Sequence, residues 1–377
     1  MLDRFRPFLW PALFVTLAAI LFTTRIRSEM VDFDVYRTAG ARALAAEPLY
    51  RVDDGHYQFK YLPAFALAMA PFARIDREAA QAIWFALSAG LLTAFVRWSV
   101  RGLPERRRSE PILAGLAVLF MAKFYAHELT LGQTNIMLGC LLAGALLAVQ
   151  IDQPMVAGAL IGVAAFVKPY ALILLPWLAF TYGMSAALSC SVVVLTGLLV
   201  PVVRYGWTGN LTLLADWYRT VTESTTPNLT SADNISLAAM WAKWLGPGGV
   251  AAGMTALSSA AAMGLVAMVW LRRLRVGSPD YLEFALLMIL IPLLSPQGWD
   301  YLLLLATPAV VCLMDRWPET SRGWQVASGL ALILMSFTLF DLMGRTLYTH
   351  FMALSIVTVA AISLAVAVAQ LRWKQLA

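Results

Sequence analysis

The chain has few of the residues from which metal, disulfide and redox sites are built. Only 13% of its 377 residues are charged, and it contains three cysteines and three histidines. The cysteines lie inside apolar runs at spacings that fit no ligand motif, so we expect small core residues without a disulfide or a metal site. So few histidines argue against a histidine-based metal centre. The cysteines are Cys140, Cys190 and Cys312, and the histidines are His56, His127 and His350.

Several nucleotide-binding and metal-binding motifs are absent. The sequence has no Walker loop, no G-x-G-x-x-G that follows a strand and no H-E-x-x-H. The net charge of +6 comes from basic residues scattered at the ends of apolar runs, which membrane topology explains better than nucleic-acid binding does. We therefore expect no cofactor, no metal and no nucleic-acid partner.

Apolar runs dominate what is present. The chain is 60% hydrophobic, whereas soluble domains are about 45–50% apolar and about 25% charged. The runs lack the alternation of a membrane barrel, so we predict an all-α, polytopic transmembrane protein that forms one domain over 1–377. We expect the first run to remain in the protein as a transmembrane span and not to be cleaved as a signal peptide. The runs cover about 8–24, 80–96, 111–122, 133–150, 154–167, 170–182, 184–203, 250–271, 284–294, 300–314, 324–340 and 351–371.

Short basic segments predict the orientation of these runs. Such segments favour the cytoplasmic side, and here they hold Arg97, Arg101, Arg106–Arg108, Arg272, Arg273, Arg275, Arg316, Arg322, Arg372 and Lys374. With the amino terminus also inside, twelve crossings satisfy every placement if the segment 61–73 does not cross. That segment is short and contains Pro63 and Pro71. If it does cross, another weak run must not.

This topology places two long loops, at about 25–61 and 204–249, outside the plasma membrane. Most connections run about 2–8 residues, and long loops on a rigid scaffold tend to carry function. The turn 127–135 and the residues 295–300 also face outward. The second loop is rich in aromatic residues. We favour an aromatic belt at the membrane interface for most of them, with stacking against a sugar as the functional alternative. These are Trp207, Trp217, Tyr218, Trp241 and Trp244.

Two carboxylates, Asp32 and Asp34, follow the first apolar run directly. Ionised groups close to a membrane boundary are costly to bury. On a helix, residues two apart diverge by about 200°, so one acid would face the protein interior and the other water. A solvated or helix-capping acid is the better reading of Asp34, whereas for Asp32 this reading and a functional one weigh about equally.

Four further polar constellations lie near the ends of apolar runs. Gly132–Asn135 opens a run, where helix capping is favoured over binding of a ligand hydroxyl. Lys168 lies between two short runs and is read equally well as a phosphate ligand or as an interfacial lysine. Ser295–Asp300 forms a tight turn, and Asn234–Leu237 starts a helix capped by Ser236 or Asn234.

The order of these motifs is similar to that of glycosyltransferase family 87. The resemblance is carried by Asp32–Tyr36 with Ala39-Gly40, Leu49-Tyr50, Phe59–Phe65, Gly132-Gln133-x-Asn135, Lys168-Pro169, Asn234-x-Ser236-Leu237 and Ser295-Pro296-x-x-Trp299. It covers roughly residues 30–305. Members of this family are GT-C-type membrane mannosyltransferases that use polyprenyl-phosphate sugars, so the resemblance implies a GT-C-like fold and this chemistry.

The resemblance makes Asp32 the catalytic acid–base residue in the first outer loop. Asp34 stands where the family varies. The family often has histidine after the Trp-Asp-like step, and here that position is Tyr301. We expect Lys168, Lys60 and Arg204 to bind the donor phosphate. We further expect the following residues to bind substrate: Asp34, Tyr36, Tyr61, Gln133, Asn135, Asn234 and Trp299.

The leading hypothesis is a transferase that moves a hexose, with mannose expected, from a polyprenyl monophosphate to an envelope glycolipid or polysaccharide. The reaction would invert the anomeric centre, with Asp32 as general base. A transporter or flippase for a lipid-linked substrate is the main alternative, although no inverted repeat of paired broken helices is present. A non-catalytic envelope scaffold is the third.

Overall fold

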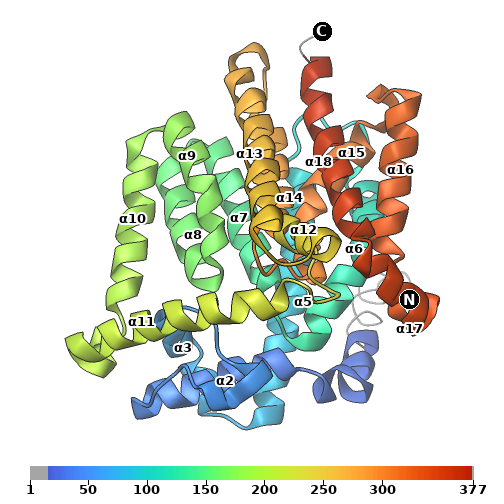
Figure 1. Cartoon of the computed structure of the whole chain (residues 1–377). Helices are drawn as coiled ribbons and strands as arrows, with labels where there is room; N and C mark the ends of the chain where they lie inside the picture. Colours follow the sequence, from blue (N-terminus) through green and yellow to red (C-terminus); the bar gives the residue numbers. More distant parts are fainter. Residues whose placement is uncertain (1–15, 376–377) are drawn as a thin grey trace, which may run out of the picture.

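The protein is built from α-helices, as its computed structural model shows for residues 16–375 (Figure 1). No strand lies among these residues, and their only β-type pairing is an isolated antiparallel bridge between Asn234 and Trp299. The predicted all-α class is therefore confirmed. The first apolar run, predicted over 8–24, lies partly outside the described residues. The part of this run that the structure describes, 16–24, is helical.

Most of the apolar runs form helices that stand side by side in one bundle (Figure 1). A helix satisfies its backbone N–H and C=O groups within one segment, as a hydrocarbon environment requires. The bundle helices are α5 (Arg77–Arg101), α6 (Glu110–Leu131), α7 (Asn135–Gln150), α8 (Pro154–Val167), α9 (Leu174–Tyr182), α10 (Met184–Leu199), α13 (Gly249–Leu271), α14 (Asp280–Leu294), α15 (Thr307–Asp315), α16 (Arg322–Ser336) and α18 (Ile356–Gln375).

Four of these helices, α5, α6, α13 and α18, are long and apolar enough to cross a membrane. Two more candidates arise if each bent pair counts as one span. One pair is α10 with α11 (Val202–Asn228), bent by 92°, and the other is α16 with α17 (Phe340–Ala353), bent by 103°. The chain is thus a membrane protein with four to six candidate spans within residues 16–375. The twelve crossings, which include shorter helices, remain a prediction.

A second group of helices lies across one end of the bundle. Figure 1 shows α2 (Val31–Ala45) and α11 in this layer, with α3 (Pro63–Ala68) between them. Helix α4 (Ala70–Ala73) follows α3 closely. The segment 61–73 therefore forms two short helices, and both are far below the roughly 20 residues that a transmembrane helix needs.

The two stretches predicted as long loops, 25–61 and 204–249, are largely helical. The first contains α2 and the 3₁₀ helix η3 (Val52–Tyr57), and the second contains most of α11 and the whole of α12 (Leu237–Leu245). A search for long apolar runs misses α2 and α11 because polar residues recur along both helices, and it misses α12 because that helix has only nine residues. The start of α12 agrees with the prediction, since Ser236 Oγ accepts the N–H of Ala239 at 3.0 Å.

An aromatic cluster fixes α2 against the bundle. Phe33 and Tyr36 of α2 pack in this cluster with Phe65 of α3 and Trp84 of α5. The indole N–H of Trp84 donates to the carbonyl of Gly132 at 2.9 Å. Gly132 has φ +70°, and a Cβ atom there would lie 2.8 Å from Phe33 Cβ, so glycine is required. This packing holds α2 beside the turn that precedes α7.

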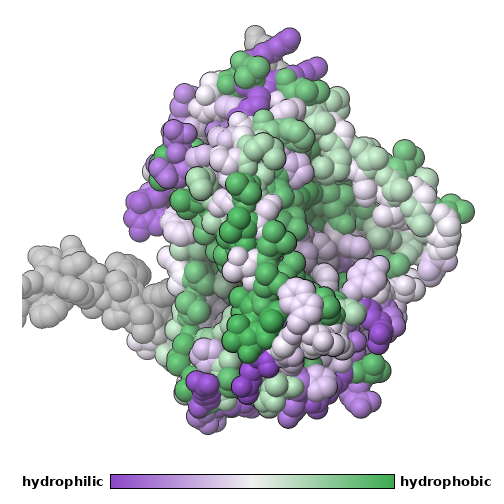
Figure 2. Space-filling model, turned by 90° about the vertical axis from the view of Figure 1, so that its left-hand side faces the viewer, coloured by the Kyte–Doolittle hydropathy of each residue, from purple (hydrophilic) through white to green (hydrophobic). Residues whose placement is uncertain are grey.

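The surface has the pattern of a membrane protein. Figure 2 shows one face of the molecule, apolar across its middle and hollowed there, with hydrophilic residues gathered toward its upper and lower ends. Basic residues follow α13, which ends on the side of the bundle away from α2 (Figure 1): Arg273–Arg275 form the 3₁₀ helix η5. The three cysteines are buried and unbonded, as expected of small core residues.

Candidate functional site

A cavity of about 560 Å³ lies where the α2 layer meets the bundle. Its lining comes from α2, the segment after η3, the end of α6, the turn before α7, the end of α8, α11 and the residues before η6 (Asp300–Ala306). The cavity brings together seven of the residues predicted to form the site. They are Asp32, Tyr36, Lys60, Tyr61, Gln133, Lys168 and Trp299.

Asp32 lies in the first turn of α2 and turns its carboxylate toward this cavity. Its Oδ2 accepts one hydrogen bond, of 2.7 Å, from the side-chain amide of Gln133. Burial raises the pKa of the Asp32 carboxyl, while the hydrogen bond from Gln133 and the charge of Lys168 lower it in part. A carboxylate with a raised pKa is a stronger base than an exposed one.

Gln133 is oriented by two tyrosines. The hydroxyl groups of Tyr36 and Tyr61 donate to its Oε1 at 3.0 Å and 3.4 Å. These bonds direct the NH2 group of the amide toward Asp32 and toward the hydroxyl of Tyr301, which it reaches at 3.2 Å. Both the oxygen and the nitrogen of the Gln133 amide therefore have hydrogen-bond partners within the protein, and one of these partners is the Asp32 carboxylate.

Two lysines form a cationic wall of the same cavity. Lys168 lies at the end of α8, with its Nζ 5.1 Å from the centre of the Tyr61 ring. Burial and the charge of Lys168 lower the pKa of Lys60, and Asp32 opposes them. The indole of Trp217 donates to the Lys60 carbonyl at 3.1 Å and so holds this segment against α11. Neither lysine forms an ion pair within residues 16–375, which leaves both charges available to an anionic ligand.

Asp34 and Arg204 lie outside this cavity. Asp34 turns away from Asp32, as the helical geometry predicts, and forms an ion pair with Arg77 at 2.5 Å. It lines a smaller hollow of about 340 Å³ on the outer side of α2. Arg204 is exposed, and its guanidinium donates to the carbonyl of Leu44. The positions of both side chains are explained by contacts to the protein.

Asn135 and Asn234 are buried next to the cavity and support its walls. The side-chain amide of Asn135 donates to Glu128 at 3.0 Å. The amide of Asn234 donates to the carbonyl of Pro296 at 2.9 Å, and its Oδ1 accepts the N–H of Ser236. Both residues satisfy backbone or buried polar groups near helix ends, where such groups lack partners.

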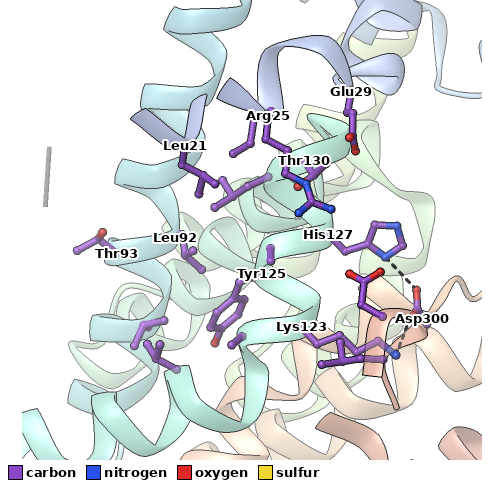
Figure 3. Close-up of a pocket in the computed structure, with 18 of the residues that line it drawn as sticks. Leu21, Arg25, Glu29, Leu92, Thr93, Lys123, Tyr125, His127, Thr130 and Asp300 are labelled. Carbon is purple, nitrogen blue, oxygen red and sulfur yellow. Dashed lines mark ion pairs between the residues drawn. The ribbon is translucent and has the colours of Figure 1, made fainter. Parts of the chain in front are cut away.

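The structure adds an ionic cluster that the sequence analysis missed. Lys123 and His127, one turn apart on α6, both face Asp300, which starts η6 (Figure 3). The ion-pair distances are 3.0 Å for Lys123 Nζ and 3.4 Å for His127 Nδ1. His127 also packs edge-on against the ring of Tyr301, with centroids 5.2 Å apart. The sequence feature that could have indicated this cluster is the spacing of Lys123 and His127, which lie one turn apart in a largely apolar helix.

The lining contains further residues that had no assigned role. Tyr301, noted only as a departure from the family pattern, bonds to Gln133 at the cavity wall. Of the aromatic residues predicted to form an interfacial belt, Trp217 lines the cavity. No group of three His, Cys, Asp or Glu side chains suited to a metal ion lies among the described residues. The other unpredicted lining residues with polar side chains are His56, Tyr57, Gln58, Tyr170, Asn228, Ser231, Asp233 and Gln297.

This arrangement suits proton transfer beside a leaving anion. A carboxylate within hydrogen-bond reach of a bound hydroxyl can remove its proton, and nearby cations stabilise negative charge that develops on a departing group. Asp32 has the position that the first role requires, and Lys60 and Lys168 have the position that the second requires. The cavity places all three side chains around one space.

Comparison with known proteins agrees with this chemistry. The family model of glycosyltransferase family 87 matches residues 59–296. The matched range includes Gln133 and Lys168 and begins after α2, which carries Asp32. No curated protein and no solved structure matches the chain. The chain belongs to glycosyltransferase family 87 and is a membrane glycosyltransferase.

Proposed function

We propose that this enzyme transfers a hexose, with mannose expected, from a polyprenyl-phosphate donor to an envelope glycolipid or polysaccharide. Asp32 is the general base in this proposal, and Lys168 and Lys60 bind the donor phosphate. The observation that carries it is the shared cavity, in which a half-buried carboxylate faces two lysines that have no acidic partner among the described residues.

The reaction is a single displacement. The acceptor hydroxyl attacks C1 of the sugar, its proton passes to Asp32, and the bond between C1 and the phosphate oxygen breaks. The bond electrons leave with the polyprenyl phosphate, and the configuration at C1 inverts. Because the leaving group is already a stable anion, the two lysines can stabilise it without a separate general acid.

The proposed phosphate site follows from the charges of the cavity. A lysine ammonium is a compact charge with three donors and suits phosphate oxygens. Arg204 is not part of the proposed phosphate site, because it lies outside the cavity and its guanidinium donates a hydrogen bond to the Leu44 carbonyl. Trp299 and Tyr61, which line the same space, are placed to contact the transferred sugar.

The proposed orientation puts this cavity on the extracytoplasmic side of the plasma membrane. It lies at the α2 end of the bundle, whereas Arg273–Arg275 follow α13, which ends on the opposite side (Figure 1). Basic segments at span ends favour the cytoplasm, so the opposite end faces outward. Nucleotide sugars are absent on that side, which favours a lipid-linked donor.

A reconstituted assay tests this function. Purified enzyme in proteoliposomes receives radiolabelled mannose either as decaprenyl-phosphate mannose or as GDP-mannose, with a lipid and polysaccharide extract as acceptor. We expect product from the lipid-linked donor alone, with an inverted anomeric linkage by NMR. Product from GDP-mannose, a retained configuration, or movement of labelled lipid across the bilayer without product would contradict the proposal.

A further inference from the structure

A second, larger cavity opens on the side of the bundle. It is a groove of about 980 Å³ along α5 and α6, bordered by residues 21–29 and by the start of α17 (Figure 3). Val118, on its lining, is 48% exposed, so the groove is open to the surroundings of the bundle. Its walls belong to helices that qualify as membrane spans, and the surroundings are therefore lipid.

The floor of the groove has the shape and length that a hydrocarbon chain needs. Small residues recur every fourth position along α6, from Ala114 through Val118, Ala122 and Ala126 to Thr130. At 1.5 Å per residue this row extends over about 24 Å, most of the roughly 30 Å thickness of a bilayer core. Figure 3 shows Leu21 and Leu92 across from the ionic cluster.

The polar wall of the groove carries charges of both signs, from Arg25, Arg97 and Lys123 and from Glu29, Glu110, Asp300 and Asp341. Lys123 is bonded to Asp300, and Arg97 to Glu110, at 3.0 Å and 3.5 Å. Lys123 is 8% exposed, and its ammonium has no hydrogen-bond partner besides this ion pair among the described residues. A wall with donors and acceptors in balance suits hydroxyl groups, which both donate and accept. The wall of Lys60 and Lys168 has unpaired positive charge and suits phosphate instead.

His127 joins the groove to the cavity of about 560 Å³ around Asp32, which is the catalytic cavity of the proposed function. Its side chain lines both spaces, and Asp300 holds its Nδ1 at 3.4 Å. A molecule with its tail in the groove can therefore extend a headgroup past His127 toward Asp32. The two lysines line the catalytic cavity and not the groove, so the two substrates can approach from different sides.

We infer that the groove binds a lipid-anchored acceptor, with its hydrocarbon chains along α5 and α6 and its sugar headgroup between His127 and Asp32. The inference rests on the proposed function and narrows it: the acceptor is a membrane glycolipid, whereas a soluble or delipidated polysaccharide would not need the groove. His127 is a positioning residue for the acceptor headgroup.

Bulky substitutions on α6 test the inference. Ala122→Trp and Val118→Trp fill the groove, while Leu119→Trp adds the same ring to an exposed position of α6 that does not line it. With decaprenyl-phosphate mannose and chloroform–methanol-extracted lipids, we expect the first two variants to lose at least tenfold of the transfer rate. Leu119→Trp should stay within twofold of the natural protein. Melting temperatures within a few degrees of one another show that all three variants fold.

A binding measurement assigns the groove to one of the two lipids. Native mass spectrometry of the protein with decaprenyl phosphate should show retention within twofold of the natural protein in Ala122→Trp. Loss of that retention would assign the groove to the donor and overturn the inference. So would unchanged transfer in both groove variants, or labelled product found only in the delipidated polysaccharide.

His127→Ala provides an independent readout. It should raise KM for the lipid acceptor more than tenfold and leave KM for the donor within twofold; an equal change in both would contradict the positioning role. If the natural protein transfers no sugar at all, the proposed function fails. The groove is then tested by the lipids that copurify: a sugar-bearing lipid lost on Ala122→Trp supports it, and no such difference overturns it.

Discussion

The side-chain amide of Gln133 donates a hydrogen bond of 2.7 Å to Asp32 Oδ2, which joins the turn before α7 to the first turn of α2. The bond occupies one carboxylate oxygen and stabilises the ionised form. The second oxygen forms no hydrogen bond within residues 16–375, so it remains available to an acceptor hydroxyl. The Asp32 carboxylate is therefore oriented by a residue from a distant part of the chain.

Gln133→Leu should shift the pH profile of the enzyme. The hydrogen bond from Gln133 lowers the pKa of Asp32, so its loss raises that pKa and moves the acid limb of kcat/KM to higher pH. A hydrogen bond to a charged group is worth about 1.5–3 kcal/mol, which corresponds to roughly one to two pH units. A lowered rate with an unshifted acid limb would contradict this role.

Lys168→Met should weaken donor binding. Loss of one charge-assisted hydrogen bond, worth about 1.5–3 kcal/mol, predicts a rise of roughly 10- to 150-fold in KM for the polyprenyl-phosphate sugar. The same change at Lys60 should act in the same direction, because both lysines line the catalytic cavity. Steady-state kinetics with varied donor checks this. Arg204→Met is the matched control, since Arg204 lies outside the cavity, and an effect as large as that of Lys168→Met would contradict the assignment.

Asp32→Asn should raise the thermal stability of the folded protein at neutral pH. Burial raises the pKa of Asp32, so the ionised carboxylate costs folding free energy that a neutral amide does not. In the natural protein, this cost appears as pH rises from the pKa of Asp32 in the unfolded chain, about 3.9, through its raised pKa in the folded protein. The gain in melting temperature should therefore be present at pH 7 and vanish near pH 3. A gain that does not depend on pH would contradict the burial argument.

Gly132→Ala should destabilise the protein and lower its activity. Gly132 has a positive φ, and an added Cβ would lie 2.8 Å from Phe33 Cβ. The left-handed conformation alone costs about 1–2 kcal/mol for a residue with a side chain. Gly115→Ala is the matched control, since nothing lies within 4 Å of its added Cβ and alanine favours its helix. Melting curves of both variants check this, and equal stability would contradict it.

Local patterns predicted the helical class and the opposite directions of Asp32 and Asp34, because hydropathy and the helical period depend on neighbours in the chain. They could not separate Gln133 from Asn135. Both residues open the same run, yet Gln133 reaches Asp32 while Asn135 is bonded to Glu128. Only the packing of α2 against the turn before α7 decides between them.

The ionic cluster shows the other limit of local patterns. Lys123 and His127 are one helical turn apart, but Asp300 is far away in the sequence and meets them only through the packing of α6 against η6. Arg204 shows the converse. Its charge made it a phosphate candidate, and its position beside the Leu44 carbonyl depends on how α11 lies over α2. Such contacts between distant segments follow from the tertiary structure.

The most direct test of the account compares Asp32→Asn with Asp34→Asn in the reconstituted transfer assay. Both variants remove one negative charge from the same helix, but only Asp32 lines the catalytic cavity. Loss of a general base predicts a fall in kcat of roughly 10²–10⁴-fold for Asp32→Asn, with Asp34→Asn within a fewfold of the natural protein. A folded Asp32→Asn enzyme that transfers sugar at the normal rate would contradict the central claim.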